Sequence, residues 1–285
     1  MSRLAYVNGR FLPLSEAGVS VEDRGFQFAD AIYEVWAVFG GRLADSEGHF
    51  ARLERSLDEL RIPRPMGRKA LELVLREAVR RNRVKEGLLY LQVTRGVARR
   101  DHPFPTVPTQ PAIVITAKSL DRAANNAKAE AGVGVITLPE NRWGRCDIKT
   151  VGLLPNVLAK QAARERGAAE AWFVDEMGLV TEGASSNAWI LDKEGTLRTR
   201  DTQANILRGV TRKSVMELLA REGLKFEERP FSVEDAREAR EAFITGAGTL
   251  VTPVTSIDGQ PVGEGKPGPL AMRLRALYIE QAKSA

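Results

Sequence analysis

The feature that most limits the possible folds of this chain is a set of expected β-hairpins, in which two strands are joined directly by turn residues. Asn8-Gly9 separates two apolar segments near the N-terminus, and Gly40-Gly41 divides the apolar segment 31–44. Asn-Gly and Gly-Gly pairs between apolar runs are typical of β-hairpins. Two further turns, Asp175–Gly178 and Asp192–Gly195, each interrupt a strand-like run. Since the strands do not alternate one by one with helices, the pattern favours an α+β fold over a doubly wound parallel sheet.

Helical spacing of apolar residues marks the segment after the second hairpin. Phe50, Leu53, Leu57 and Leu60 recur at this spacing, with Ser46 placed as a cap. Further helices are expected at 71–78, 158–167 and 210–222, before residue 240 and at the C-terminus. The expected strands cover 88–96, 112–118, 132–138, 170–183, 187–199, 225–231 and 241–257.

A change of composition near the middle of the chain separates two halves. Residues 119–132 are polar and alanine-rich, with little to bury. We therefore expect a linker at 118–126. It would join a smaller N-terminal α+β domain, residues 1–117, to a larger C-terminal domain, residues 127–285, with a mixed sheet and helices. A chain of 285 residues is long enough for this division.

Charge and hydropathy make several classes of protein poor candidates. The chain carries 42 basic and 37 acidic side chains, a net charge of +5 without an isolated basic run. This balance favours a solvated mixed-charge surface over nucleic-acid binding, and its small positive excess suits anionic small molecules. No segment approaches the roughly 20 consecutive apolar residues of a membrane span. The N-terminus has no apolar signal core.

The few cysteine and histidine residues argue against an internal disulfide and a structural zinc site. Cys146 is the single cysteine, so no internal disulfide can form. With only His49 and His102 beside it, the usual zinc ligands are too few for a structural cluster. We therefore expect no metal site and a reducing, cytoplasmic setting. Neither a GxGxxG motif after a strand nor a GxxxxGK motif occurs, so dinucleotide and P-loop chemistry have no support.

One lysine lies in a setting that suits a nucleophile. Lys149 follows the segment 145–148 and precedes the apolar run Val151–Leu154. A lysine attacks carbonyl groups only when its amine is deprotonated, and an apolar or positively charged setting lowers the pKa of such an amine. Taken alone, the segment also fits a lysine whose side chain extends from a strand end to the surface.

Four further stretches set polar groups among apolar ones. Glu182 lies in the stretch 180–187, which is dense in small polar residues. Gly209 precedes a predicted helix whose first turn carries Thr211, and a helix start favours a phosphate. Small residues at Thr245–Thr249 let amides converge on an anion, and Arg99–His102 could hold a carboxylate. Each stretch alone also fits an ordinary turn, cap or solvated loop. Together they supply the groups that pyridoxal phosphate chemistry needs.

The order and spacing of these motifs resemble those of the fold-type IV aminotransferases, and within that class the bacterial D-amino acid transaminases. The resemblance extends from Glu22–Val35 to Thr252–Val254, nearly the whole chain. It implies a two-domain enzyme that uses pyridoxal 5′-phosphate. Lys149 matches the family's Schiff-base lysine, and Glu182 matches the glutamate that pairs with the pyridine nitrogen. The other cofactor contacts that the resemblance implies are ring packing by Leu207 and phosphate binding by Arg52, Val210 and Thr211.

The glycine-rich turn departs from the family pattern. Where the relatives carry serine and threonine hydroxyls that touch the phosphate, this chain has Gly246 and Ala247. The backbone amides at these two positions still suit a phosphate, so we expect the contact there to be made by the backbone.

The resemblance also implies a substrate site and an assembly. Tyr33, Arg100 and His102 match the trap for the substrate α-carboxylate. In the family the arginine and histidine reach the site from the neighbouring subunit, so a homodimer with active sites at the subunit interface is implied. The expected reaction moves an amino group between a D-amino acid, such as D-alanine, and a 2-oxo acid, such as 2-oxoglutarate. The Arg100–His102 pair is the sequence feature that favours the D series.

Three other activities remain open on the same fold. They are a branched-chain L-amino acid transaminase, an (R)-amine transaminase and an aminodeoxychorismate lyase. The Arg100–His102 pair argues against each of them. A protein that binds pyridoxal phosphate without turnover is the non-enzymatic alternative, and the presence of both Lys149 and Glu182 argues against it.

Overall fold

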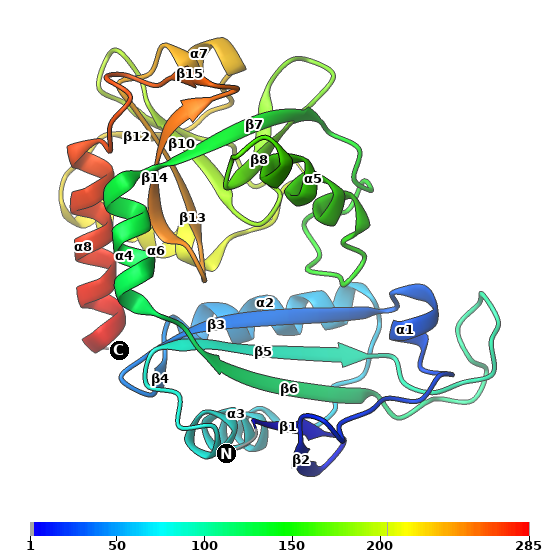
Figure 1. The fold of residues 1–285 in the computed structure, drawn as a ribbon. Coiled ribbons are helices and arrows are strands. Elements are labelled where there is room, and N and C mark those ends of the chain that lie inside the picture. The colour runs from blue at the N-terminus through cyan, green and yellow to red at the C-terminus, as the bar shows by residue number, and fades with distance from the viewer. Residues whose placement is uncertain (1–2, 204, 285) are drawn as a thin grey trace. The chain divides into compact units, whose positions relative to one another are not determined.

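The structure, a computed structural model, describes residues 3–203 and 205–284, which divide into two compact units. The first unit contains the chain up to Asp121 together with Ile148–Gly152, and the second contains Arg122–Asp147 and Leu153–Ser284. Residues 1, 2, 204 and 285, which the expected domains include, lie outside the described residues. Both units combine strands with helices, as the predicted α+β class requires (Figure 1).

The first unit is built on an antiparallel sheet with the strand order β2-β1-β6-β5-β3-β4. The predicted hairpins at Asn8-Gly9 and Gly40-Gly41 are confirmed, and all four turn residues have the positive φ that Asn and Gly tolerate. The elements are β1 (Leu4–Val7), β2 (Arg10–Pro13), α1 (Arg24–Phe28), β3 (Ala31–Phe39), β4 (Arg42–Leu43), α2 (Ser46–Glu59), α3 (Arg68–Arg81), β5 (Gly87–Thr94) and β6 (Ala112–Ser119).

Alternation along β3 sorts its side chains between the two faces of this sheet. Ile32 and Trp36 lie in the core with the apolar sides of α2 and α3. Tyr33 lies on the other face, where its ring stacks on that of Tyr90 at 5.7 Å. Because Glu34 shares a face with Ile32 and Trp36, the sequence places a carboxylate inside the core. That carboxylate needs buried partners.

The second unit has the mixed sheet that the sequence predicts. The strand order is β12-β11-β10-β13-β14-β7-β8-β9, with β15 paired to β14. Pairing is parallel at β11/β12, β14/β7 and β7/β8 and antiparallel at the other junctions. The elements are α4 (Arg122–Ala131), β7 (Val133–Pro139), α5 (Leu154–Glu165), β8 (Glu170–Val174), β9 (Val180–Gly183), β10 (Asn187–Leu191), β11 (Leu197–Thr199), α6 (Val210–Arg221), β12 (Phe226–Glu228), α7 (Val233–Arg237), β13 (Glu241–Gly246), β14 (Leu250–Ile257), β15 (Gln260–Pro261) and α8 (Pro269–Ser284).

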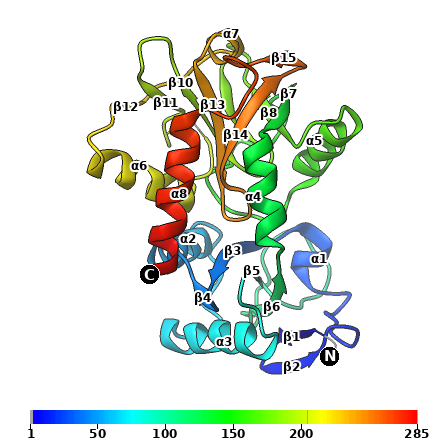
Figure 2. The same ribbon diagram turned by 60° about the vertical axis from the view of Figure 1, so that its left-hand side comes forward.

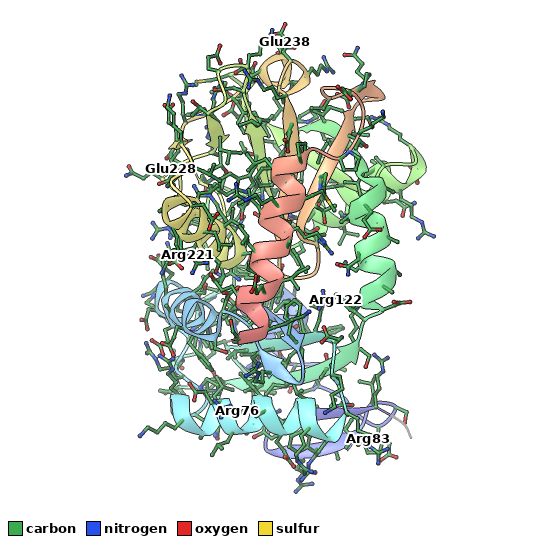
Figure 3. The ribbon with its side chains drawn as sticks, turned by 90° about the vertical axis from the view of Figure 1, so that its left-hand side faces the viewer. Arg76, Arg83, Arg122, Arg221, Glu228 and Glu238 are labelled. Atoms are coloured by element: carbon green, nitrogen blue, oxygen red, sulfur yellow. The ribbon has the colours of Figure 1, made fainter. Side chains whose placement is uncertain are left out.

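Helices α4 and α8 lie side by side in this unit, and both contact β14 (Figure 2). Viewed along this side, α8 has α6 on one flank and α4 on the other, with Arg122 at the foot of α4 and Arg221 on α6 (Figure 3). The helices therefore cover the strands β13 and β14, which bound the glycine-rich turn at 246–249.

Local structure differs from the sequence-based expectation at three places. The segment expected as a linker, 118–126, contains the end of β6 and the start of α4, because alanine-rich sequence forms helix readily even with little to bury. Asp45 is the N-cap of α2, and Ser46 is the first helical residue, with its hydroxyl donating to the Leu43 carbonyl at 3.2 Å. Helix α5 begins at Leu154, before the expected residue 158, since Pro155 suits a first helical turn.

Candidate active site

Lys149 belongs to the first unit, in a segment that pairs with the start of β3. The Tyr33 amide donates to the Lys149 carbonyl at 3.0 Å, and the Val151 amide donates to the Ala31 carbonyl at 3.2 Å. Side chains alternate along an extended segment, so Ile148 enters the core and Lys149 faces the other way. The Lys149 Nζ lies 4.2 Å from the centre of the Tyr33 ring. The structure thus brings together the expected Schiff-base lysine and one expected substrate residue.

Arg52 lies on the helix-covered face of the same sheet. Its Nε and Nη2 donate to the two carboxylate oxygens of Glu34 at 2.7 and 2.9 Å, and His49 Nδ1 lies 2.7 Å from Glu34 Oε2. All three side chains are buried. Burial alone would raise the pKa of Glu34, but Arg52 and His49 hold that pKa well below its usual range. Burial lowers the pKa of His49 despite Glu34, so the neutral ring donates from Nδ1 to the carboxylate.

The loop after β5 carries Arg100 and His102, and both side chains are exposed. The Phe28 ring at the end of α1 contacts both, with the Arg100 guanidinium 5.1 Å and the His102 ring 5.5 Å from its centre. Arg24 donates to the Asp101 and His102 carbonyls at 2.6 and 3.1 Å. Within the described residues, no hydrogen bond or ring contact joins Arg100 or His102 to Tyr33 or Lys149.

Glu182 is buried at the end of β9 in the second unit, 3% exposed. Its Oε1 accepts from Arg142 Nη1 at 2.6 Å, and its Oε2 accepts from Asn187 Nδ2 at 3.0 Å. The Leu207 amide donates to the same carboxylate at 3.1 and 3.2 Å. The structure therefore brings Leu207, the expected ring-packing residue, directly to Glu182. Four donor contacts hold the carboxylate in one orientation.

A second carboxylate completes the network around Glu182. Glu140, just after β7, accepts from Arg142 Nε at 2.8 Å and Nη2 at 2.6 Å, and from the Thr181 hydroxyl at 2.8 Å. Burial raises the pKa of Glu182, and the Arg142 cation opposes this effect. Arg142 is thus shared between two carboxylates, with its guanidinium 4.5 Å from the centre of the Phe173 ring. The sequence reasoning missed Glu140 and Arg142, although two charges directly after a strand were a visible signal.

The start of α6 has the features of an anion site. Gly209 is the N-cap, and no side chain caps the helix there. The amides of the first helical turn, including those of Val210 and Thr211, have no partner within the helix. A Cβ on residue 209 would lie 1.9 Å from Asn187 Oδ1, so only glycine fits. The same asparagine that holds Glu182 therefore also packs against this helix start.

The glycine-rich turn between β13 and β14 contains Gly246 and Ala247, both half-buried. A Cβ on residue 246 would lie 3.1 Å from the Thr249 hydroxyl and 3.2 Å from the Ser185 carbonyl oxygen. The turn thus lies beside the connection from β9 to β10, which directly follows the strand that carries Glu182.

The expected site residues form two groups, one in each unit. The first unit holds Lys149 with Tyr33, Arg52 with Glu34 and His49, and the exposed pair Arg100 and His102. The second unit holds Glu182 with Leu207, the start of α6 and the glycine-rich turn. Glu34 and His49 were missed as members of the Arg52 cluster, although a glutamate on the apolar face of a strand was a signal of buried pairing.

The chain matches the family described as amino-transferase class IV over residues 31–257. It is 40% identical to a D-alanine aminotransferase of Staphylococcus haemolyticus, over 98% of this chain and 99% of the relative. It is 41% identical to a D-alanine aminotransferase of Bacillus licheniformis, over 94% of this chain and 93% of the relative.

Solved structures show the same fold. A branched-chain amino acid aminotransferase of Escherichia coli superposes with a TM-score of 0.91 at 23% identity, covering 100% of this chain and 96% of that chain. A T.th. branched-chain amino acid aminotransferase, solved with pyridoxamine 5′-phosphate, gives a TM-score of 0.90 at 27% identity, covering 100% and 95%. The chain belongs to the class IV aminotransferases, and the resemblance seen in the sequence is confirmed.

Proposed function

We propose that this aminotransferase uses pyridoxal 5′-phosphate to move amino groups between a D-amino acid, such as D-alanine, and a 2-oxo acid, such as 2-oxoglutarate. Its similarity to D-alanine aminotransferases over nearly the whole chain supports the D series. The observation that carries the proposal is the Glu182 carboxylate, which is buried and oriented by Arg142, Asn187 and Leu207. Such a carboxylate suits a protonated ring nitrogen.

The residues present fit this cofactor. The α6 start offers amides that no side chain caps, and a helix start of this kind suits a phosphate. Arg52 offers a guanidinium, and we assign it to the phosphate together with Val210 and Thr211. We assign the amides of Gly246 and Ala247 to the same phosphate. Leu207 would pack on the ring, and Lys149 would bind the aldehyde carbon.

Each assigned residue has one chemical task. When bound, pyridoxal phosphate supplies an aldehyde that condenses with amines and a ring that withdraws electrons from the substrate Cα. The Lys149 amine would act as the base that takes the proton from the substrate Cα and later returns it. Proton transfer by a positioned base contributes about 10²–10⁴-fold to such a rate. Glu182 would favour the protonated form of the ring nitrogen.

Substrate binding is assigned to Tyr33, Arg100 and His102, which would hold the α-carboxylate. We propose that Arg100 and His102 act in the active site of a neighbouring subunit, so that the enzyme is a homodimer with active sites at the subunit interface. The exposure of both side chains supports this assignment, because an exposed loop is available to a second chain. The Arg24 and Phe28 contacts keep the two side chains on one rigid loop.

A branched-chain L-amino acid transaminase is the second candidate. The observation in its favour is the likeness to solved branched-chain enzymes, with a TM-score of 0.90 at 27% identity. Identity of 40% to D-alanine aminotransferases favours the D series over it. We place the enzyme in the cytoplasm, where its single cysteine, a free thiol, stays reduced. Among the described residues, no helix is both long enough and apolar enough to span a membrane.

The cofactor and the reaction can be tested in one preparation. Purified enzyme should be yellow, and its visible absorbance band should be absent from Lys149→Ala. D-alanine with 2-oxoglutarate should release pyruvate. A colourless protein that does not take up pyridoxal phosphate would overturn the proposal, and reaction with L-amino acids alone would overturn its D-specificity.

A further inference from the structure

Arg275 on α8 is a buried cation whose hydrogen bonds end on neutral oxygens. It is 3% exposed. Within the described residues, its guanidinium donates to the carbonyls of Thr249 and Val251 at 3.0 and 2.7 Å, and to the side chains of Asn125 and Asn126 at 2.7 and 2.8 Å. A buried charge is usually paired with an opposite charge. The positive charge of Arg275 is therefore not neutralised by a direct ion pair among the described residues, and it can attract an anion nearby.

The charge of Arg275 is retained at neutral pH. Burial and, to a smaller extent, Arg122 lower the pKa of Arg275 to about 10, while Glu130 raises it. Three units separate this pKa from pH 7, so nearly all molecules carry the cation. Its position is set by α4 and α8, the two helices that lie side by side over β14 (Figure 2).

The bonds from these two helices orient the glycine-rich turn. Arg275 binds the Thr249 carbonyl, and Asn125 donates from Nδ2 to the Gly248 carbonyl at 3.2 Å. In a planar trans peptide the N–H points opposite to the C=O. The amides of Thr249 and Leu250 are therefore directed away from α4 and α8. Leu250 has a φ of 58°, a strained value for a residue with a Cβ, and the bonds around it hold the turn in that shape.

Thr249 provides the turn with a hydroxyl that has no partner. Its Oγ1 is buried and makes no hydrogen bond within the described residues. A buried hydroxyl without a hydrogen-bond partner is unfavourable, so such a group is suited to a ligand that can supply the partner. The same oxygen lies 3.1 Å from the point that a Cβ on Gly246 would occupy. A side chain on residue 246 would therefore crowd the Thr249 hydroxyl.

We propose that the Thr249 hydroxyl binds the cofactor phosphate from across the turn, in place of the side-chain hydroxyls that Gly246 and Ala247 lack. Arg275 is the positioning residue: it orients this turn and adds a positive field behind it. This inference rests on the proposed use of pyridoxal phosphate. It assigns a residue pair to the phosphate beyond Arg52 and the α6 start.

The test compares pyridoxal phosphate with pyridoxal, which lacks the phosphate and reacts with the same lysine. Dissociation constants are measured by absorbance titration of the apoenzyme. Thr249→Val should weaken pyridoxal phosphate binding about tenfold or more, since one hydrogen bond to a charged group is lost. Pyridoxal binding should be unchanged. The matched control is Thr255→Val, which removes the same hydroxyl farther along β14 and should change neither constant.

Arg275 is tested with a charge-retaining and a neutral substitution. The phosphate preference is the ratio of the dissociation constant of pyridoxal to that of pyridoxal phosphate. Arg275→Lys should lower this ratio, and Arg275→Met should lower it more. Arg273→Lys on the exposed side of α8 serves as the control, since that side chain is 56% exposed. The ³¹P resonance of the bound cofactor should shift in the Thr249 and Arg275 variants and stay constant in the controls.

The outcomes separate this inference from the proposed function. A wild-type protein that does not bind pyridoxal phosphate would overturn both. Normal wild-type binding, with an unchanged ratio of the two dissociation constants in Thr249→Val and Arg275→Lys, would overturn the inference alone. If Arg275→Met does not fold, the other two variants decide the result.

Discussion

Arg142 donates from Nη1 to Oε1 of Glu182 at 2.6 Å, and both side chains are buried, 7% and 5% exposed. The same guanidinium binds Glu140 through Nε and Nη2. One cation thus compensates two carboxylates. The family resemblance assigns a function to Glu182 and none to Glu140. Glu140 keeps the guanidinium in place, and the guanidinium opposes the rise in the pKa of Glu182 that burial causes.

Replacing Arg142 by leucine should damage both stability and turnover. The substitution leaves the buried Glu182 and the partly buried Glu140 without their cation, and breaking a buried pair costs about 3–5 kcal/mol. The pKa of Glu182 should rise further, because the Arg142 cation no longer opposes the effect of burial and only weaker hydrogen bonds, such as that from the Leu207 amide, remain. Urea unfolding and the pH dependence of kcat measure the two effects. The control is Arg145→Leu, whose side chain is 47% exposed, and equal behaviour of the two variants would contradict the assigned role.

Acid should destabilise the first unit through Glu34 and His49. The folded pKa of His49 lies below its ordinary 6.5, and that of Glu34 lies below its ordinary 4.5. The unfolded chain therefore binds more protons, so stability falls as pH falls, first below about pH 6.5 and more steeply below about pH 4.5. Thermal unfolding of wild type and of Glu34→Gln between pH 8 and about pH 2.5 measures this. Glu34→Gln should be less stable than wild type at pH 8, and its stability should fall less as the pH is lowered. Parallel curves of melting temperature against pH would refute the account.

Arg24 should control substrate affinity from behind the Arg100 loop. It is buried and donates to the Asp101 and His102 carbonyls and to Asp30. In Arg24→Lys the fork geometry is lost, and we expect the KM for D-alanine to rise about tenfold while kcat changes little. Cofactor affinity serves as the internal control, because Arg24 has no part in the proposed cofactor contacts. A change in cofactor affinity without a change in KM would contradict the assignment.

Cys146 should react slowly with thiol reagents. Burial raises the pKa of its thiol to about 11, with Arg142 opposing the shift, and the thiol donates to the Trp143 carbonyl at 3.2 Å. At pH 8 only about one molecule in a thousand carries the reactive thiolate. The rate of alkylation by iodoacetamide should therefore rise about tenfold per pH unit from 7 to 10. A rate that levels off near pH 8.5 would show an unperturbed thiol.

Sequence reasoning predicted the fold well where the signal is local. Asn8-Gly9 and Gly40-Gly41 determine hairpins through backbone conformations that few other residues adopt, and the helical spacing from Phe50 to Leu60 identifies α2. The segment 118–126 was predicted as a linker because it buries little, yet alanine-rich sequence forms the start of α4 through backbone propensity alone.

The partners of the site residues were harder to predict from sequence. Motifs identify Lys149 and Glu182, but not the residues that position the site. Arg142 lies 40 residues from Glu182, which it binds. Arg275 lies 26 residues from Thr249, whose carbonyl it binds. Such pairings depend on strand order and helix placement, which local patterns do not determine. The buried position of Glu34 was visible as a carboxylate on an apolar strand face, whereas its pairing with both His49 and Arg52 required the placement of α2 against β3.

The most direct test of the central claim is the spectral half-reaction of the purified holoenzyme without a 2-oxo acid. Mixed with D-alanine in a stopped-flow instrument, the visible absorbance band should decay to one at shorter wavelength, with release of one pyruvate per active site. L-alanine should leave the spectrum unchanged on the same timescale, and Lys149→Ala should respond to neither. Decay with L-alanine but not D-alanine, or decay in the Lys149 variant at the wild-type rate, would contradict the account.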